Sequence, residues 1–163
     1  MRRLLTLALT LTAVAAAACV HVAAAAAEAP CWTAPESKAI AVRVLQSELT
    51  VGALACGLPD AYRTFVESQQ PALQRYGAVL TGYYARAYGE VAGERRLDAF
   101  VTRLANEAST RKADWPNGYC AFVRALTERA AVIPPETLGD FAAVHPYARK
   151  TAVAGLCPGG RNR

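Results

Sequence analysis

The feature that most constrains the fold is a helical spacing of apolar residues that recurs between glycines and prolines. The spacing is clearest over 93–112, where one face repeats at i, i+3, i+4, i+7 and i+11 through Leu97, Phe100, Val101, Leu104 and Ala108. Such spacing is typical of an amphipathic helix with one buried side. The alternating apolar and polar pattern of strands is missing from the sequence. These patterns together predict an all-α protein.

Glycine and proline divide the chain into helices joined by short connections. The pattern predicts four main helices at 35–56, 71–88, 93–112 and 119–132, short helices at 60–69 and 134–145, and an irregular tail from about 146 to 163. Short connections between long helices favour antiparallel neighbours. We therefore expect an up-down helical bundle, with the 60–69 helix covering one end.

The first 27 residues have the composition of a secretory signal peptide. Arg2 and Arg3 precede an uncharged apolar run, and Ala25-Ala26-Ala27 before Glu28 resembles a cleavage site. We expect this segment to be removed on export, leaving 28–163 as a single helical domain of about 136 residues. An alternative is a lipoprotein signal, because Ala16-Ala17-Ala18-Cys19 resembles a weak lipobox in which Cys19 would be lipidated.

Charge gives no indication of a nucleic-acid partner. The chain has 18 basic and 13 acidic residues, a formal net charge of +5 at pH 7, which falls to +3 once Arg2 and Arg3 leave with the signal peptide. The charges are interspersed, without the block of like charge that a nucleic-acid surface requires. We expect no nucleic-acid partner, and no membrane span after removal of the signal.

Four cysteines follow the signal peptide, namely Cys31, Cys56, Cys120 and Cys157. An even number in an exported chain favours two disulfides. Cys31 and Cys56 flank a predicted helix roughly 30 Å long, whereas a disulfide needs Cα atoms within roughly 7 Å. That pairing and its complement, 120–157, are therefore disfavoured.

The directions of the predicted helices favour one of the two remaining pairings. Alternating up and down helices place Cys56 and the start of the Cys120 helix at the same end of the bundle. The expected disulfides are Cys56–Cys120 and Cys31–Cys157, with 31–120 and 56–157 as the alternative. Each is expected to contribute roughly 2–4 kcal/mol, mainly by constraining the unfolded chain.

Candidate catalytic residues are few. Cys120 follows a helix start, which can activate a thiol, and His145, the only histidine after the signal, is the only histidine that could act as its base. A disulfide accounts better for Cys120, and we expect His145 at the surface. The sequence lacks haem-attachment, zinc, di-iron and phosphate-loop motifs. It assigns no catalytic, cofactor-binding or metal-binding residue.

One helix carries four tyrosines, which pack in the core or line a groove. Tyr76 and Tyr84 fit its apolar stripe, whereas Tyr83 and Tyr88 fall on the flanks. Among the carboxylates, Glu107 flanks an apolar stripe and is the strongest candidate for a site. Tyr83, Tyr88 and Glu107 are therefore the candidate binding surface for a small ligand or a partner helix.

Three stretches carry a resemblance. The chain is similar to small exported proteobacterial proteins in these stretches, which are CGLPDAYRTFVE, YYARAYG and RRLDAFVTRLANEAS, with a cysteine after the following turn. The similarity covers roughly half of the chain that follows the signal peptide. It implies an exported, disulfide-linked helical domain, and it carries over no catalytic residue and no known activity.

The leading hypothesis is an exported protein, periplasmic or secreted, with a binding or structural role. Its partner would be an unidentified protein or small ligand. One alternative is a periplasmic stress chaperone that opens to expose apolar faces. The other is a cell-wall hydrolase acting through Glu107 or another carboxylate.

Overall fold

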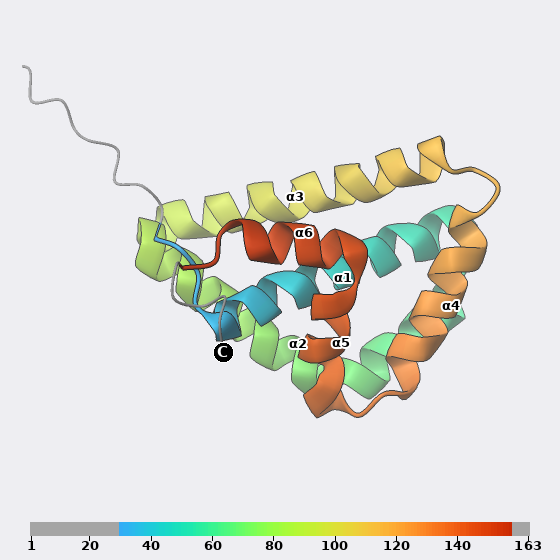
Figure 1. Cartoon of the computed structure of the whole chain (residues 1–163), viewed down its shortest axis with the longest axis horizontal. Helices are drawn as coiled ribbons and strands as arrows, with labels where there is room; N and C mark the ends of the chain where they lie inside the picture. The colour runs from blue at the N-terminus through green and yellow to red at the C-terminus, as the bar shows by residue number, and fades with distance from the viewer. Residues whose placement is uncertain (1–29, 158–163) are drawn as a thin grey trace, which may run out of the picture.

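The computed structural model describes residues 30–157, and within this range the protein is built from helices (Figure 1). The predicted signal peptide, its cleavage site and Cys19 lie outside the described residues. The helices are α1 (Ala34–Cys56), α2 (Pro59–Tyr88), α3 (Glu90–Asp114), α4 (Tyr119–Val132), η1 (Pro135–Thr137), α5 (Leu138–Val144) and α6 (Pro146–Ala154). The predicted all-α bundle of four main helices with shorter ones is confirmed.

Helix α1 is the centre of the bundle. It packs against each of the other five α-helices, and buried side chains lie all around it, among them Ile40, Val42, Val44, Leu45 and Leu49. It is long and apolar enough to cross a membrane, but 61% of its most apolar 18-residue window is buried inside the protein. Burial by neighbouring helices accounts for its apolar composition. At Gly52, a Cβ atom would lie 2.3 Å from Val123 of α4, so glycine permits this close approach.

Helix α2 is continuous, and the prediction of separate helices at 60–69 and 71–88 is wrong. Pro71 lies inside α2, although proline removes one helical hydrogen bond and crowds the carbonyl four residues earlier. Pro71 and Glu67 are both exposed, which leaves that carbonyl on the solvent side. The opposite side is fixed by Gln69, whose buried amide donates to the carbonyl oxygens of Ala130 (3.0 Å) and Ile133 (2.8 Å). Packing and these bonds outweigh the local cost of proline.

The tail is also more ordered than predicted. An irregular chain was expected from 146, but 146–154 forms α6, with Pro146 in its first turn and Ala148 and Ala152 buried. Proline is tolerated at that position because its missing N–H has no helical partner there. In Figure 1, α6 lies over α1 and beside α3.

Two disulfides hold the ends of these helices. Cys56 and Cys120 join the end of α1 to the start of α4, with Cα atoms 5.5 Å apart. Cys31 and Cys157 join the chain before α1 to the chain after α6, with Cα atoms 4.8 Å apart. These are the two pairs that the helix directions favour. The second pair lies next to a short backbone bridge between Trp32 and Leu156.

Candidate functional site

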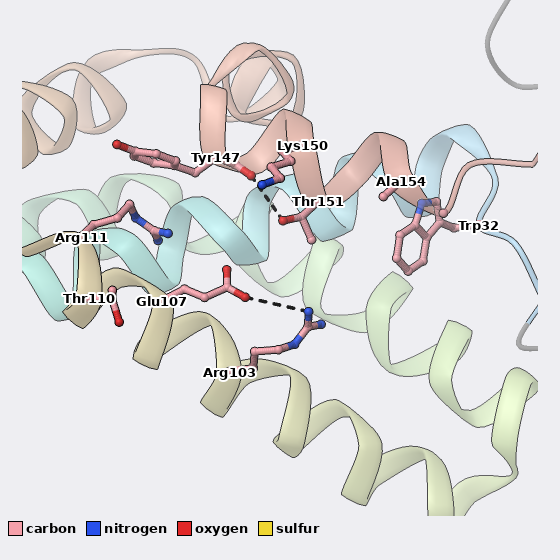
Figure 2. Close-up of a pocket in the computed structure, with 10 residues that line it drawn as sticks. Trp32, Arg103, Glu107, Thr110, Arg111, Tyr147, Lys150, Thr151 and Ala154 are labelled. Atoms are coloured by element: carbon pink, nitrogen blue, oxygen red, sulfur yellow. Dashed lines mark hydrogen bonds and ion pairs between the residues drawn. The ribbon is translucent and has the colours of Figure 1, made fainter. Parts of the chain in front are cut away.

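A groove runs between α3 and α6, and we call it the α3–α6 groove (Figure 2). Both helices pack against α1 but make almost no contact with each other. The space between them measures about 720 Å³, within the range of roughly 300–1,000 Å³ typical of small-molecule sites. The groove is therefore a consequence of two helices resting side by side on a third.

The α3 wall is polar. It consists of Arg103, Glu107, Thr110 and Arg111, whose spacing places them on one side of the helix. The carboxylate of Glu107 lies 3.9 Å from the Arg103 guanidinium, and both side chains are partly exposed. Figure 2 shows the Glu107 side chain pointing from α3 toward α6. The predicted site residue Glu107 is therefore part of a groove.

The α6 wall ends at an indole ring. Tyr147, Lys150, Thr151 and Ala154 line this side, and Trp32 lies at the far end. The Trp32 ring is fixed because its Nε1–H donates to the carbonyl oxygen of Ala152 at 2.8 Å. A Cβ atom on Gly155 would lie only 2.4 Å from this ring. Glycine at 155 therefore gives the indole its place at the end of the groove.

Arg111 connects the groove to the interior of the bundle. Its guanidinium donates from Nε to Oε2 of Glu48 at 2.8 Å, and its Nη2 also contacts that oxygen. The same guanidinium lies 4.3 Å from the centre of the Tyr147 ring. Glu48 is fully buried on α1. The buried carboxylate of Glu48 therefore compensates most of the positive charge of Arg111 and fixes the position of its guanidinium.

A group of polar side chains lies beneath Arg111, and we call it the buried polar cluster. Its members are Glu48, Arg111, Tyr119 and His145. Four of its atoms are buried without a hydrogen-bond partner among the described residues: Glu48 Oε1, the Tyr119 hydroxyl, and both ring nitrogens of His145. Such groups normally find partners, so a partly satisfied network of this kind is costly. The Oε1 atom of Gln69 is the one other buried side-chain atom of the described residues without a partner, so most of this cost falls on the buried polar cluster.

Burial dominates the acid–base properties of this cluster. It lowers the pKa of His145 below its ordinary value of 6.5; the Arg111 charge adds to this lowering, whereas the Glu48 charge opposes it. Burial and the nearby Glu48 charge raise the pKa of the Tyr119 hydroxyl. His145 was expected at the surface, and that expectation is wrong. The residue joins α5 to α6, and its ring packs near Phe122 and Tyr147 at 5.8 and 5.4 Å between centroids.

The structure does not bring the other predicted site residues into the groove. Tyr83 is buried, donates its hydroxyl to the carbonyl oxygen of Pro30 at 2.7 Å, and packs edge-on against Trp32. It supports the end of the groove from behind. Tyr88 is partly buried beneath the Arg96 guanidinium, 4.3 Å above its ring. Cys120 is held in a disulfide, which leaves no free thiol there.

Sequence reasoning missed most of the groove. Tyr147 and Lys150 went unrecognised because no helix was expected after 146. Trp32 went unrecognised as a groove residue because its place there is set by Ala152 and Gly155, at the end of that helix. Glu48 offered a signal, since it is a carboxylate inside an otherwise apolar helix face, where an unpaired charge would be very costly. Its partner Arg111 lies 63 residues later and could not be inferred from spacing.

The described residues contain no group of three or more His, Cys, Asp or Glu side chains placed to hold a metal ion. No protein-family model matches this chain, and neither a curated protein nor a solved structure matches it. The functional argument therefore rests on the groove and the buried polar cluster.

Proposed function

We propose that this chain is an exported binding protein and that its ligand site is the α3–α6 groove. The observation that carries the proposal is the convergence of three cationic side chains, one carboxylate and two aromatic rings on one cavity of about 720 Å³. A concave site with a few oriented polar groups is the usual form of a small-molecule site. The fixed Arg111 and Trp32 mean that part of this site is already organised before a ligand arrives.

An exported location, in the periplasm or outside the cell, fits the same proposal. Two disulfides form and persist in oxidising compartments. The signal-like first 27 residues and the resemblance to small exported proteins point in the same direction. Protein recovered from the cytoplasm with both cysteine pairs reduced would contradict this part of the proposal.

The binding role is tested by filling the groove. Ala154 is exposed and lines the groove, so Ala154→Trp adds bulk there without removing an interaction. Ala125→Trp places the same ring on an exposed position of α4 and serves as the matched control. Ligand-observed NMR with a fragment library should give hits that Ala154→Trp loses and Ala125→Trp keeps. Absence of hits, or hits that both variants keep, would overturn the groove as the ligand site.

A stress chaperone is the second candidate, and His145 is the observation that favours it. A buried neutral histidine at the junction of α5 and α6 must gain a charge as the pH falls, which would favour opening of this junction. This candidate predicts suppressed aggregation of a client protein and binding of an apolar dye at about pH 5. A protein that stays compact and inert at that pH would exclude it.

The groove does not favour a cell-wall hydrolase. Glycoside hydrolysis ordinarily uses two carboxylates across a cleft. Among the described residues that line the groove, Glu107 is the single carboxylate, and it faces Arg103. Loss of peptidoglycan turnover in Glu107→Gln would revive this hypothesis.

A further inference from the structure

The three cationic side chains of the groove differ in how far a neighbouring carboxylate already compensates their charge. Arg111 is committed to the buried Glu48. Among the described residues, Arg103 has the long 3.9 Å ion pair with Glu107 and a contact with the Phe100 ring, whose centre lies 5.2 Å from the guanidinium. Its side chain is 61% exposed, and exposed pairs of this kind contribute little. Lys150 has no ion pair within the described range 30–157. Arg103 and Lys150 are therefore the two charges able to turn toward a ligand, one from each wall.

The Trp32 end of the groove offers a ring rather than a hydrogen bond. The indole N–H is used by the Ala152 carbonyl, and the ring contacts Gly155 and Tyr83. Trp32 is nevertheless only partly buried and lines the groove. Indole surface favours planar, weakly polar groups. The second aromatic ring, Tyr147, already carries the Arg111 guanidinium. The stacking surface available to a ligand is therefore at the Trp32 end.

The distance along the groove limits the size of a ligand. Tyr147 and Ala154 are seven residues apart on α6, which corresponds to about 10 Å. Lys150 lies between them in the sequence and lines the groove. A molecule with one or two fused rings and an acidic group can therefore reach Trp32 and Lys150 together.

We propose that the α3–α6 groove takes a small organic anion that carries a planar ring, with the ring against Trp32 and the acidic group between Arg103 and Lys150. This inference rests on the proposed binding function. The inference predicts that Glu107 opposes ligand binding, because its carboxylate repels an anion and competes with it for Arg103. Removing the Glu107 charge should therefore strengthen binding, whereas removing the Lys150 charge should weaken it.

The test uses three probes with one ring system and different charge. They are 2-naphthoate, neutral 2-naphthamide and the cation 2-naphthylmethylammonium. Each is titrated into the oxidised protein, and Kd is obtained from the NMR shifts of backbone amides. We expect 2-naphthoate to bind about tenfold more tightly than the amide, which corresponds to one charge-assisted contact, and the cation to bind most weakly.

Charge variants then locate the contact. Lys150→Gln should weaken 2-naphthoate binding about threefold or more, and Glu107→Gln should strengthen it by a similar factor. Arg149→Gln is the matched control, because it removes the same charge from an exposed position of α6 that does not line the groove. Arg149→Gln should leave the affinity for both probes unchanged, whereas Lys150→Gln and Glu107→Gln should change the affinity for 2-naphthoate more than that for the neutral amide.

The outcomes separate the ligand class from the site. Equal binding of naphthoate and naphthamide in the groove, or tighter binding of the cation, would overturn the anion inference and leave the groove as a binding site. Equal effects of Lys150→Gln and Arg149→Gln would also overturn it. Failure of all three probes to shift groove amides would count against the inference and the proposed function together.

Discussion

At the scale of single residues, the buried polar cluster makes stability depend on pH. The pKa of His145 is lowered in the folded protein, so between that lowered pKa and 6.5 the unfolded chain binds the extra proton and the folded one does not. The contribution of His145 to stability is therefore complete above pH 6.5 and is lost progressively as the pH falls through this interval. Four groups surround His145: Glu48 from α1, Arg111 from α3, Phe122 from α4 and Tyr147 from α6.

Replacing His145 tests this dependence. His145→Phe keeps an aromatic ring between Phe122 and Tyr147 and removes the only histidine of the described residues. Urea midpoints measured at pH 7.5 and pH 5.5 should differ less in the variant than in the natural protein. The same drop in both proteins would show that His145 is not the responsible group.

The Glu48–Arg111 pair is the second residue-scale test. Arg111→Gln leaves a fully buried carboxylate without its cation, and breaking such a pair costs about 3 kcal/mol or more. The matched control is Arg63→Gln, which breaks an exposed pair with Asp60 and should cost under about 1 kcal/mol. Equal losses of unfolding free energy in the two variants would contradict the role assigned to Glu48.

At the scale of elements, Gln69 joins the middle of α2 to the end of α4. Its side-chain amide donates hydrogen bonds to the carbonyl oxygens of Ala130 and Ile133, which have no partner within α4. Gln69→Leu should therefore destabilise the protein by about 1–2 kcal/mol in urea unfolding. Gln70→Leu, at an exposed neighbouring position, is the control and should change stability little. If Gln69→Leu leaves the unfolding free energy unchanged, packing alone keeps α2 helical at Pro71.

The helices that the sequence predicts well are those whose apolar spacing coincides with burial. Phe100, Leu104 and Ala108 on α3 are buried as their spacing indicates. Prediction fails where a distant partner decides the outcome. At Pro71, the hydrogen bonds of Gln69 to α4 offset the cost of proline inside a helix. At 146–154, α1 and a disulfide stabilise a helix that is too short to form alone. The groove was predicted only at Glu107, because its walls come from α3, α6 and Trp32, which the sequence does not show to be neighbours.

At the scale of the whole molecule, the two disulfides have different tasks. Their cysteines are separated by 64 and 126 residues. Because these loops are long, the chain-entropy account raises the limit for each bond to about 4–5 kcal/mol, above the 2–4 kcal/mol that is typical of disulfides. Cys56–Cys120 joins α1 to α4, and neither of its cysteines lines the groove. Cys31–Cys157 holds the end of α6 and the Trp32 segment, which together form the end of the groove.

The two disulfides should therefore separate stability from binding. Cys56→Ala with Cys120→Ala should lower the unfolding free energy and leave 2-naphthoate affinity unchanged in the folded protein. Cys31→Ala with Cys157→Ala should lower both, because Trp32 loses its fixed position. The comparison requires urea unfolding and NMR titration of both variants. Equal loss of naphthoate affinity in the two would contradict this division.

The most direct test of the central claim is a crystal structure of the oxidised protein soaked in 2-naphthoate. The proposed site predicts density in the α3–α6 groove, with the naphthalene ring against Trp32 and the carboxylate within hydrogen-bond distance of Lys150. Density for the probe at another surface, with the groove free of it at a saturating concentration, would contradict the assignment of this groove as the ligand site.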